Sequence, residues 1–342
     1  MTKVSIQSVT ESFDAEGRLV KERMKQAEKI GLFHASSAKI NIANDALIEG
    51  LLDQGTLAMI YGQSNAGKSF VALDIAAHLS SGKKWLGREV KRSNVLFVAL
   101  EGRRGLENRL VGLSQANKLY PNSGLICRST RLNLFEGSAD AQDLIDQANW
   151  TFDESPYGRA IFIDTMAMAA VGASENDGRD MGIVLEKLRW IKEETDAMIM
   201  LVHHVGKDAS KGARGHSSIR ATLDTELELM TQGGNRYLKV TKQREYEKGG
   251  KIPFSLETIS LLDTGMTRVT TKIVQPADTT KLSANDAIVS LLKEAAMPSD
   301  KLYEAFKAVR NWSNAKSQFN QALTTLKEKS VITEDEGLLK LT

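Results

Sequence analysis

The sequence is poor in three features that would narrow its class at once: cysteine, net charge and long apolar runs. Cys127 is the one cysteine in 342 residues, which excludes an intrachain disulfide and fits a reducing compartment. The formal net charge is only +2, so any nucleic-acid site has to be a local basic patch. The most apolar runs, such as residues 197–202, are far shorter than the ~20 residues of a membrane span, and the first residues do not resemble a signal peptide. We therefore expect a soluble, cytoplasmic protein without membrane association.

Residues 57–80, LAMIYGQSNAGKSFVALDIAAHLS, are the most informative stretch. A short apolar segment leads through a loop into a helical pattern, and the loop at 62–69 fits G-x-x-x-x-G-K-[ST] at every position. The two glycines allow backbone N–H groups to point at phosphate oxygens, and the positive end of the following helix adds to that anion site. Lys68 is expected to reach the β- and γ-phosphates of ATP, and the Ser69 hydroxyl to bind Mg²⁺. The residues expected to contact the nucleotide are Gly62, Gln63, Ser64, Asn65, Ala66, Gly67, Lys68, Ser69 and Phe70.

Beyond this loop, apolar runs alternate with helical patterns. The apolar runs are typical of buried strands and lie at residues 95–100, 160–163 and 198–202. The helical patterns lie at residues 105–116, 139–150 and 180–195. This alternation predicts an α/β fold with a mainly parallel sheet and helices on both faces. Further strands, which would extend the sheet at one edge, are expected at residues 227–230, 237–241 and 267–273.

The domain organisation follows from changes in composition along the chain. Residues 1–45 are mixed and predict an N-terminal arm or linker, with a loose tail as the alternative. A short helix is expected at 46–52 before the first strand. The α/β core should span residues 46–274, followed by a polar, proline-containing linker at 275–282. Residues 283–342 show three helical patterns and then two short strands around an acidic turn, which is the order of a small winged-helix-like domain. Such domains either bind DNA or mediate protein contacts.

Carboxylates follow two of the predicted strands, and open α/β sheets bind ligands at the carboxyl ends of their strands. Asp164 ends the strand AIFID, where it is expected to hold Mg²⁺ with Ser69. A helix cap or turn residue is the alternative role for Asp164. Glu101 ends VLFVALE and is expected to act as the general base that polarises the attacking water. A surface glutamate in a turn is the alternative for that position.

His203 and His204 end the strand MIMLVHH. A polar side chain at this position can contact the γ-phosphate and report its hydrolysis to the following loop. The sequence does not decide which of the two histidines does so. A metal site is less favoured because adjacent strand residues point to opposite faces. A structural histidine at a strand end is the third possibility.

Two groups of cations follow later in the chain. The glycine-rich loop at 206–220 is expected to contact nucleic-acid phosphates through Lys207, Lys211, Arg214 and Arg220, although an ordinary solvated loop has a similar composition.

The second group is Lys242 and Arg244, which share one face of an extended segment. They suit an arginine finger that reaches the nucleotide of a neighbouring subunit. A pair of exposed strand charges is the alternative.

Taken together and in this order, GQSNAGKS, VLFVALEG, IFIDT, LVHHVGK and KQR resemble the RecA-type P-loop ATPase core. Among ATPases with this core, the motifs most resemble those of the RepA-like hexameric replicative helicases of plasmids and phages, which are related to the DnaB-type ring helicases. The resemblance spans about residues 46–259, and no separate primase-binding domain is recognised before it.

The resemblance implies a homo-oligomer, a hexameric ring, with ATP and Mg²⁺ between subunits and single-stranded DNA in the central channel. It assigns Lys68 and Ser69 to the nucleotide and metal, Glu101 to the base and Asp164 to the Walker B position. A histidine of the 203–204 pair would be the sensor, and Lys242 and Arg244 the finger in trans. A primase or an initiator protein is a further expected partner. The resulting hypothesis is an ATP-dependent DNA helicase or translocase; the alternative is an ATPase switch that loads or regulates other DNA proteins without unwinding.

Overall fold

The structure is a computed structural model. The residues that it describes are 32, 46–153, 155–205, 213, 215–232, 235–246, 249–263, 267–277, 283–309, 314–335 and 337–342. The chain divides after Asp45 into two units. The elements below all belong to the second unit, and the N-terminal arm expected at 1–45 lies outside the described residues apart from Leu32.

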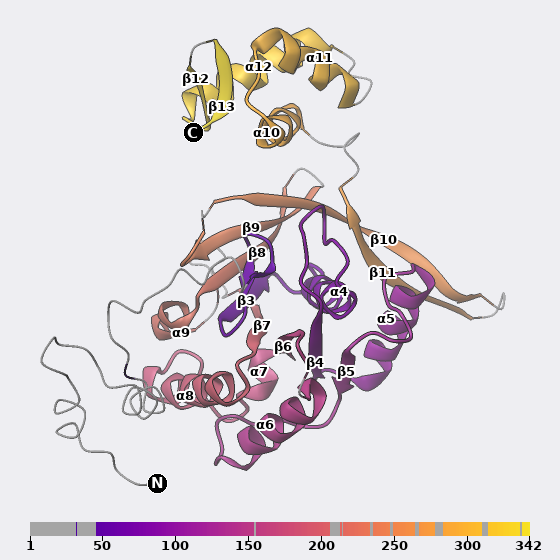
Figure 1. Cartoon of the computed structure of the whole chain (residues 1–342), viewed down its shortest axis with the longest axis vertical. Coiled ribbons are helices and arrows are strands. Elements are labelled where there is room, and N and C mark those ends of the chain that lie inside the picture. Colours follow the sequence, from indigo (N-terminus) through magenta and orange to yellow (C-terminus); the bar gives the residue numbers. More distant parts are fainter. Residues whose placement is uncertain are drawn as a thin grey trace, which may run out of the picture. The chain divides into compact units, whose positions relative to one another are not determined.

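A central sheet, nine-stranded over the described residues, organises the fold (Figure 1). Its parallel part runs in the order β8 (Thr225–Gln232), β3 (Leu57–Gly62), β7 (Met198–His204), β6 (Gly158–Asp164), β4 (Ser93–Ala99) and β5 (Leu125–Arg128). The inner strands are apolar along their whole length because both faces of the sheet are covered; every residue of β3 is buried. The predicted α/β fold with a mainly parallel sheet is confirmed.

Antiparallel strands continue the sheet beyond β8, as expected from the sequence. They are β9 (Asn235–Gln243), β10 (Lys251–Asp263) and β11 (Arg268–Pro276). The sequence did not predict β10. Pro276 has no N–H to donate and lies on the outermost strand, opposite Phe254. A linker was expected at 275–282, but its first two residues, 275 and 276, are the last two residues of β11.

Helices cover both faces of the sheet, and each face has its own apolar core. The helices over one face are α4 (Lys68–Ser81) and α5 (Arg103–Gln115). Those over the other face are α6 (Ala139–Phe152), α7 (Met166–Ala169), α8 (Gly178–Thr195) and α9 (Ser217–Thr222). Side chains alternate along a strand, so β3 places Ile60 in the first core and Met59 in the second. Each such buried side chain contributes ~1.5–3 kcal/mol to folding.

The prediction of a helix at residues 46–52 is wrong. This segment forms two short antiparallel strands, β1 (Ala46–Ile48) and β2 (Leu52–Asp53), with Gly50 in the turn at a φ of 61°. The apolar spacing of ALIEGLL also suits a helix, but the turn buries Leu47 and Leu51 completely. Burial in the shared core thus overrides the local helical pattern.

The last described residues form three helices and a hairpin with a separate apolar core. They are α10 (Ala284–Glu294), α11 (Ser299–Val309), α12 (Ala315–Glu328), β12 (Ile332–Asp335) and β13 (Leu338–Leu341). Ser283 caps α10 by accepting from the backbone N–H of Asp286. The core is made of residues such as Phe306 and Phe319, whose rings lie 5.3 Å apart. The element order is that of the small winged-helix-like domain predicted from the sequence.

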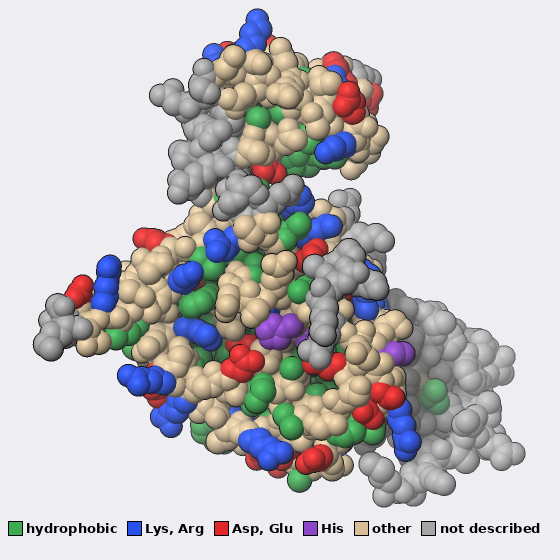
Figure 2. Space-filling model, turned by 180° about the vertical axis from the view of Figure 1, so that it is seen from behind, with side chains coloured by type: hydrophobic (Ala, Val, Ile, Leu, Met, Phe, Trp, Pro, Cys, Tyr) green, Lys and Arg blue, Asp and Glu red, His purple; other side chains and the backbone are tan. Residues whose placement is uncertain are grey.

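No helix among the described residues combines the length and the apolar character that a membrane crossing requires. The surface of the core is mixed in charge, as the net charge suggests. Figure 2 shows acidic and basic side chains interspersed over one face of the molecule, without a single large basic field. A nucleic-acid site would have to be local.

Candidate functional site: a phosphate cradle at the carboxyl edge of the sheet

The loop at residues 62–69 connects the end of β3 to the start of α4. A side chain at Gly62 would place its Cβ 2.6 Å from the backbone oxygen of Leu229, and one at Gly67 would meet Leu256 at 2.5 Å. Gly67 also has a φ of 107°, which disfavours every other residue. The tip of the loop, Gln63 to Asn65, is exposed. The two glycines therefore shape an open cradle at the positive end of α4, as the motif predicts.

Lys68 is buried inside this cradle with only 5% of its surface exposed. Its Nζ donates to the backbone oxygens of Gly62 at 3.0 Å and Gln63 at 2.9 Å, and lies 3.2 Å from Nδ1 of His204. Burial lowers the pKa of Lys68, and the nearby carboxylates of Asp164 and Glu101 partly oppose that shift. The ammonium group is thus held by uncharged acceptors in a place where phosphate oxygens would bind it more strongly.

The two histidines at the end of β7 have different surroundings. His204 faces the cradle, where Nδ1 contacts Lys68. A charged ammonium can only donate, so Nδ1 must be the accepting nitrogen and the proton must lie on Nε2. His203 is fully buried and lies beside Tyr61 in the register of β3 and β7. The structure therefore brings His204, and not His203, to the loop that the sequence identified.

Asp164 lies at the end of β6 and is 3% exposed. In the sheet, β7 separates β6 from β3, the strand that leads into the cradle. The Ser69 hydroxyl hydrogen-bonds to it, and its Oδ1 has no hydrogen-bond partner among the described residues. Burial raises the pKa of Asp164, while the Ser69 hydrogen bond and the charges of Arg109 and Lys68 lower it. A buried carboxylate oxygen left without a partner beside a serine hydroxyl fits the protein side of a Mg²⁺ site.

No cluster of three or more His, Cys, Asp or Glu side chains that could hold a metal occurs among the described residues. Mg²⁺ commonly uses one or two protein ligands together with phosphates and water, so Ser69 and Asp164 suffice for that mode of binding.

Glu101 follows β4, which pairs directly with β6. Its Oε1 accepts a hydrogen bond of 3.0 Å from the Thr165 hydroxyl, the residue after Asp164. Glu101 is exposed. The contact with Thr165 uses Oε1 alone, so Oε2 is not required for it. The predicted base and the predicted metal ligand therefore lie on adjacent strands at the same edge of the sheet.

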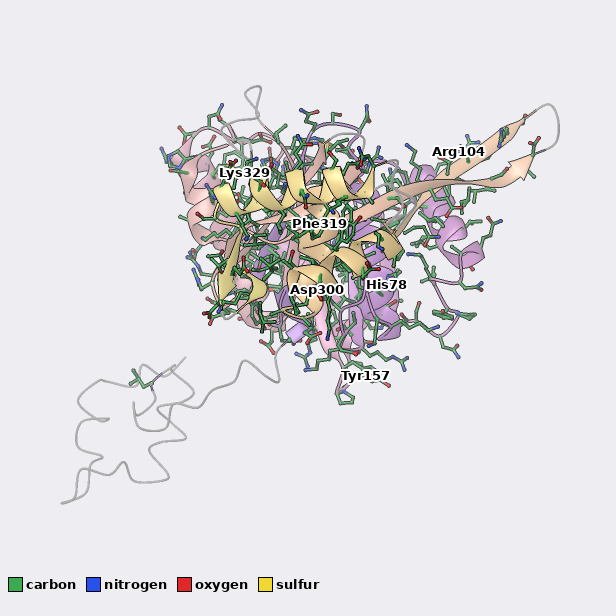
Figure 3. All side chains as sticks on the ribbon, turned by 90° about the horizontal axis from the view of Figure 1, so that it is seen from above. His78, Arg104, Tyr157, Asp300, Phe319 and Lys329 are labelled. Atoms are coloured by element: carbon green, nitrogen blue, oxygen red, sulfur yellow. The ribbon has the colours of Figure 1, made fainter. Side chains whose placement is uncertain are left out.

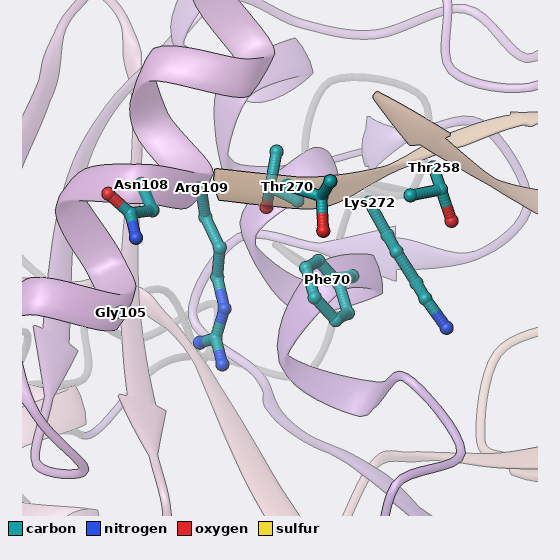
Figure 4. Close-up of a pocket in the computed structure, with 8 residues that line it drawn as sticks. Phe70, Gly105, Asn108, Arg109, Thr258, Thr270 and Lys272 are labelled. Carbon is teal, nitrogen blue, oxygen red and sulfur yellow. The ribbon is translucent and has the colours of Figure 1, made fainter. Parts of the chain in front are cut away.

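Sequence reasoning missed Arg109, which extends from the middle of α5. Its guanidinium lies over the ring of Phe70, 5.0 Å from the ring centre, and its charge acts on Asp164. Both side chains line a cavity of about 260 Å³, together with Thr258 and Lys272 of the β10–β11 ribbon. Figure 4 shows these side chains. Because Phe70 directly follows Ser69, the cavity adjoins the cradle. Arg109 does not follow a strand, so no simple sequence signal identified it.

Lys242 and Arg244 lie far from the cradle of their own chain. In the register of the sheet, Gln243 pairs with Thr225, which pairs with Ala58 near the start of β3, whereas the cradle begins at Gly62. Because β9 runs antiparallel to β8, it ends level with the start of β3. The pair therefore lies at the amino ends of the parallel strands, which is the edge of the sheet opposite the cradle. The structure does not bring this pair to the predicted cradle residues of the same chain.

Both cations of this pair are held in place. Lys242 donates to the backbone oxygens of Arg220 at 2.7 Å and Ala221 at 3.2 Å, near the end of α9. Burial lowers the pKa of Lys242. Arg244 forms an ion pair of 2.7 Å with Asp224 and keeps 57% of its side chain exposed.

Asp224 was not identified from the sequence. Its Oδ2 accepts from the backbone N–H of Leu57 at 2.8 Å, while Oδ1 binds Arg244. Asp224 thus links the first residue of β3 to the exposed Arg244. No sequence motif marks a carboxylate in this role.

Of the expected nucleic-acid residues, Lys207, Lys211 and Arg214 lie outside the described part of the chain. Arg220 lies on α9, where it pairs with Glu226 at 3.1 Å. Its side chain is 61% exposed, so the ion pair leaves part of the guanidinium accessible.

Comparison with known proteins identifies a family and two similar structures. A family model described as an AAA domain matches residues 32–210. Two solved structures are similar to part of the chain. The RadB recombinase is 18% identical, with a TM-score of 0.44 over 60% of this chain and 89% of that one. A KaiC-like protein from Pyrococcus horikoshii OT3 is 19% identical, with a TM-score of 0.42 over 62% and 90%.

The comparison with curated proteins gave no match. The family match covers just over half of the 342 residues and contains the whole cradle from Gly62 to His204. The chain therefore belongs to the AAA domain family, and its loop at residues 62–69 is that of a P-loop ATPase.

Proposed function

We propose that this ATPase is a motor on single-stranded DNA, a helicase or translocase that replicates a plasmid, phage or integrated element and works as a hexameric ring. One observation carries the proposal. The cradle lies at one edge of the sheet, and the cation pair Lys242 and Arg244 lies at the other. Cations so placed cannot serve the cradle of their own chain, but they suit the cradle of an adjacent copy.

The residues of the cradle divide the hydrolysis of ATP among them. Lys68 exchanges its two backbone oxygens for β- and γ-phosphate oxygens. Ser69 and Asp164 would hold Mg²⁺, which would supply positive charge to the phosphates. Glu101 accepts a proton from the attacking water, and the Thr165 hydroxyl fixes the orientation of that carboxylate.

His204 links the nucleotide to the loop that follows β7. When Lys68 moves to the phosphates, the contact between its Nζ and Nδ1 of His204 breaks, and the imidazole is released to meet the γ-phosphate. The loop at 206–220 begins two residues later and carries Lys207, Lys211, Arg214 and Arg220. We propose that these cations contact the phosphates of single-stranded DNA, so that hydrolysis moves the strand.

The cavity beside Phe70 suits the ribose and base of the same nucleotide. It opens next to the residue that follows Ser69, where the α-phosphate of a nucleotide in the cradle would lie. The Phe70 ring and the guanidinium of Arg109 offer flat surfaces to a base, and Thr258 and Asn108 offer hydrogen bonds.

Arg244 is the residue proposed to act in trans. A guanidinium has five N–H donors, and the ion pair with Asp224 leaves most of them to bind a γ-phosphate. Asp224 holds the arginine in one orientation, which reduces the entropy lost when it binds the neighbour's nucleotide.

The test is the rate of ATP hydrolysis with and without single-stranded DNA, measured together with the native mass and with strand separation on a forked duplex. We expect a hexamer, stimulation by the single strand and unwinding. A monomer whose hydrolysis ignores DNA would refute the proposal. Stimulation without unwinding would instead support the switch that loads or regulates other DNA proteins.

A further inference from the structure

Glu226 is a buried carboxylate that the proposed hydrolysis of ATP does not use. Side chains around the rim of the core extend into solvent in Figure 3, as the labelled Tyr157 does, whereas Glu226 is only 1% exposed. Glu226 lies on β8, and its Oε2 accepts from the Thr241 hydroxyl at 2.8 Å and pairs with Nε of Arg220 at 3.1 Å. Burying a carboxylate is costly unless it is paired, so these two contacts indicate what Glu226 does.

A chain of hydrogen bonds connects Glu226 to the loop of the cradle. The Tyr61 hydroxyl hydrogen-bonds to Thr241, and Tyr61 directly precedes Gly62, the first residue of the loop. Thr241 has one hydroxyl proton and donates it to Glu226, so its oxygen must accept from Tyr61. Burial raises the pKa of Tyr61 to about 12, so its phenol keeps the proton that this bond requires. The order of donors from the cradle to Glu226 is therefore fixed.

At its other end the chain of bonds reaches α9. This helix has only six residues, so it depends on tertiary contacts for its stability. Ile219 is its buried apolar side chain, and Arg220 pairs with Glu226. Lys242 donates to the backbone oxygens at positions 220 and 221. The pair between Arg220 and Glu226 is thus one of the contacts that hold α9 against the sheet.

Nucleotide binding would disturb the cradle end of the chain of bonds. The backbone oxygen of Gly62 accepts from Nζ of Lys68 at 3.0 Å and from the N–H of Val205 at 3.3 Å. When Lys68 turns to the phosphates, Gly62 keeps only the bond to Val205. A displacement of Gly62 then passes to Tyr61 through the backbone, and from Tyr61 to Thr241 through their hydrogen bond.

Arg220 can leave Glu226 without leaving a buried charge unpaired. The side chain of Arg220 is 61% exposed, so it can turn towards solvent. Lys242 lies opposite Glu226 in the register of β8 and β9, and the two charges act on each other. The Lys242 ammonium can therefore neutralise the carboxylate when the guanidinium leaves it. A phosphate group is the anion that an exposed guanidinium binds best, through paired hydrogen bonds.

We propose that Glu226 is a positioning residue that holds Arg220 without nucleotide and releases it when a nucleotide binds in the cradle. The released guanidinium would bind phosphate groups of the single strand. This route differs from the contact between His204 and Lys68, because Tyr61 and Ile219 pack in the core on the face of the sheet opposite α4. The release of Arg220 rests on nucleotide binding, and only the identity of its phosphate partner rests on the proposed function.

Hydrogen exchange of the full chain tests the release of Arg220. Mg²⁺ and a non-hydrolysable ATP analogue should make the amides of α9 exchange at least threefold faster, because the helix loses one of its contacts. Glu226→Gln keeps the size of the side chain but removes its charge. In this variant α9 should exchange fast without nucleotide, and nucleotide should add nothing.

Glu228→Gln is the matched control, because Glu228 lies two residues further along β8 and therefore on the same face. It should respond to nucleotide as the unaltered protein does. Protection of the loop at residues 62–69 by the analogue shows in every variant that nucleotide is bound.

The affinity for a single-stranded oligothymidylate, measured by fluorescence anisotropy, tests where Arg220 goes. The unaltered protein should bind at least threefold more tightly with the analogue. Glu226→Gln should bind that tightly without it, whereas damage to the fold would weaken binding. Thr241→Val interrupts the chain of bonds but keeps the ion pair, so it should bind weakly with and without nucleotide. A gain in one variant and a loss of response in the other cannot both come from lost stability.

The proposal is overturned if nucleotide leaves the exchange of α9 unchanged in the unaltered protein, or changes it equally in Glu226→Gln. It is also overturned if Glu226→Gln binds the oligothymidylate more weakly than the unaltered protein does without nucleotide. If the exchange follows the expectation but neither protein binds the oligothymidylate, the single-strand motor is refuted and the release of Arg220 stands.

Discussion

The two edges of the central sheet differ in how completely their charged groups are partnered. At the carboxyl edge, the Asp164 carboxylate is buried with Oδ1 unpartnered among the described residues, and the Lys68 ammonium is held only by neutral groups. At the opposite edge, Arg244 has a carboxylate partner and Lys242 has two backbone oxygens. The two lysines are thus held alike by neutral groups, and the edges differ in their other charge: the Asp164 carboxylate has an unpartnered oxygen among the described residues, whereas Arg244 already has a carboxylate partner.

This difference indicates different roles for the two edges. Burying charged groups without full compensation costs stability, and proteins retain such sites where ligand binding offsets the cost. At the opposite edge, the exposed Arg244 has a carboxylate partner and is already oriented. Under the proposed function, the edge that binds phosphate and metal and the edge that offers an ordered cation would be complementary in two copies of the chain.

The largest expected effect tests whether one edge serves the other in trans. Arg244→Ala should reduce hydrolysis by about 10³-fold or more, the range of an arginine finger. Mixing Arg244→Ala chains with Lys68→Ala chains should restore activity, because some interfaces then combine an intact cradle with an intact arginine. The measurement is ATPase rate against mixing ratio.

Arg268→Ala is the matched control, since Arg268 is also exposed and ion-paired on an outer strand, at 3.9 Å from Asp263. It should leave hydrolysis unchanged. Absence of rescue at every mixing ratio would mean that the arginine does not act on a neighbouring chain.

Glu101→Gln should separate binding from hydrolysis at the cradle edge. The amide cannot accept the proton of water, so hydrolysis should fall by about 10²–10⁴-fold, while nucleotide affinity persists because Lys68 and Ser69 are unchanged. Glu107→Gln, an exposed glutamate of α5 paired with Arg103, is the control and should hydrolyse normally. Nucleotide affinity is measured by titration calorimetry and turnover by phosphate release. Normal turnover in Glu101→Gln would assign the base to another residue.

A smaller effect is expected from Asp224→Asn at the opposite edge. The amide oxygen still accepts the backbone N–H of Leu57, but the charge that orients Arg244 is lost. Hydrolysis should fall about tenfold, equivalent to ~1.4 kcal/mol, mainly in kcat. The melting temperature should change little. A lower melting temperature with an unchanged kcat would show that Asp224 only supports the fold.

The sequence predicted the cradle edge better than the opposite edge, for a physical reason. Strands β3, β4, β6 and β7 are buried on both faces, so they appear as continuous apolar runs, and the residues that follow them converge at one edge. Asp164 and Glu101 could therefore be placed from position alone. The choice of His204 over His203 needed the register with β3, because it depends on the face to which each side chain points.

Features that depend on pairing between distant segments could not be predicted. β5 is short and lies at the edge of the sheet, and β10 contains Pro253 within a mixed pattern, so neither forms an apolar run. Arg109 acts from the middle of a helix, and Asp224 acts through the first residue of a strand 167 positions earlier. None of these positions has a local signature, because tertiary contacts alone define their roles.

The smallest expected effect concerns the pH dependence of the cradle edge. Burial raises the pKa of Asp164, so the folded protein takes up a proton at Asp164 more readily than the unfolded chain does. Without ligand, the ionised carboxylate therefore costs stability at neutral pH, and that cost should disappear as pH falls through the raised pKa. Asp164→Asn cannot ionise, so the unliganded variant should melt at a higher temperature than the unaltered protein at neutral pH, and the difference should vanish in acid.

The binding of Mg²⁺ and nucleotide should show the opposite sign, because the metal requires the ionised carboxylate. Stabilisation by Mg²⁺ and a non-hydrolysable ATP analogue should weaken as pH falls through the same range, and Asp164→Asn should show little stabilisation at any pH. The measurement is a series of melting curves across pH with and without ligand. Glu136→Gln, an exposed carboxylate, is the control and should follow the unaltered protein. If Asp164→Asn melts lower than the unaltered protein at neutral pH, the carboxylate stabilises the unliganded fold, and the two edges of the sheet do not differ in the way described.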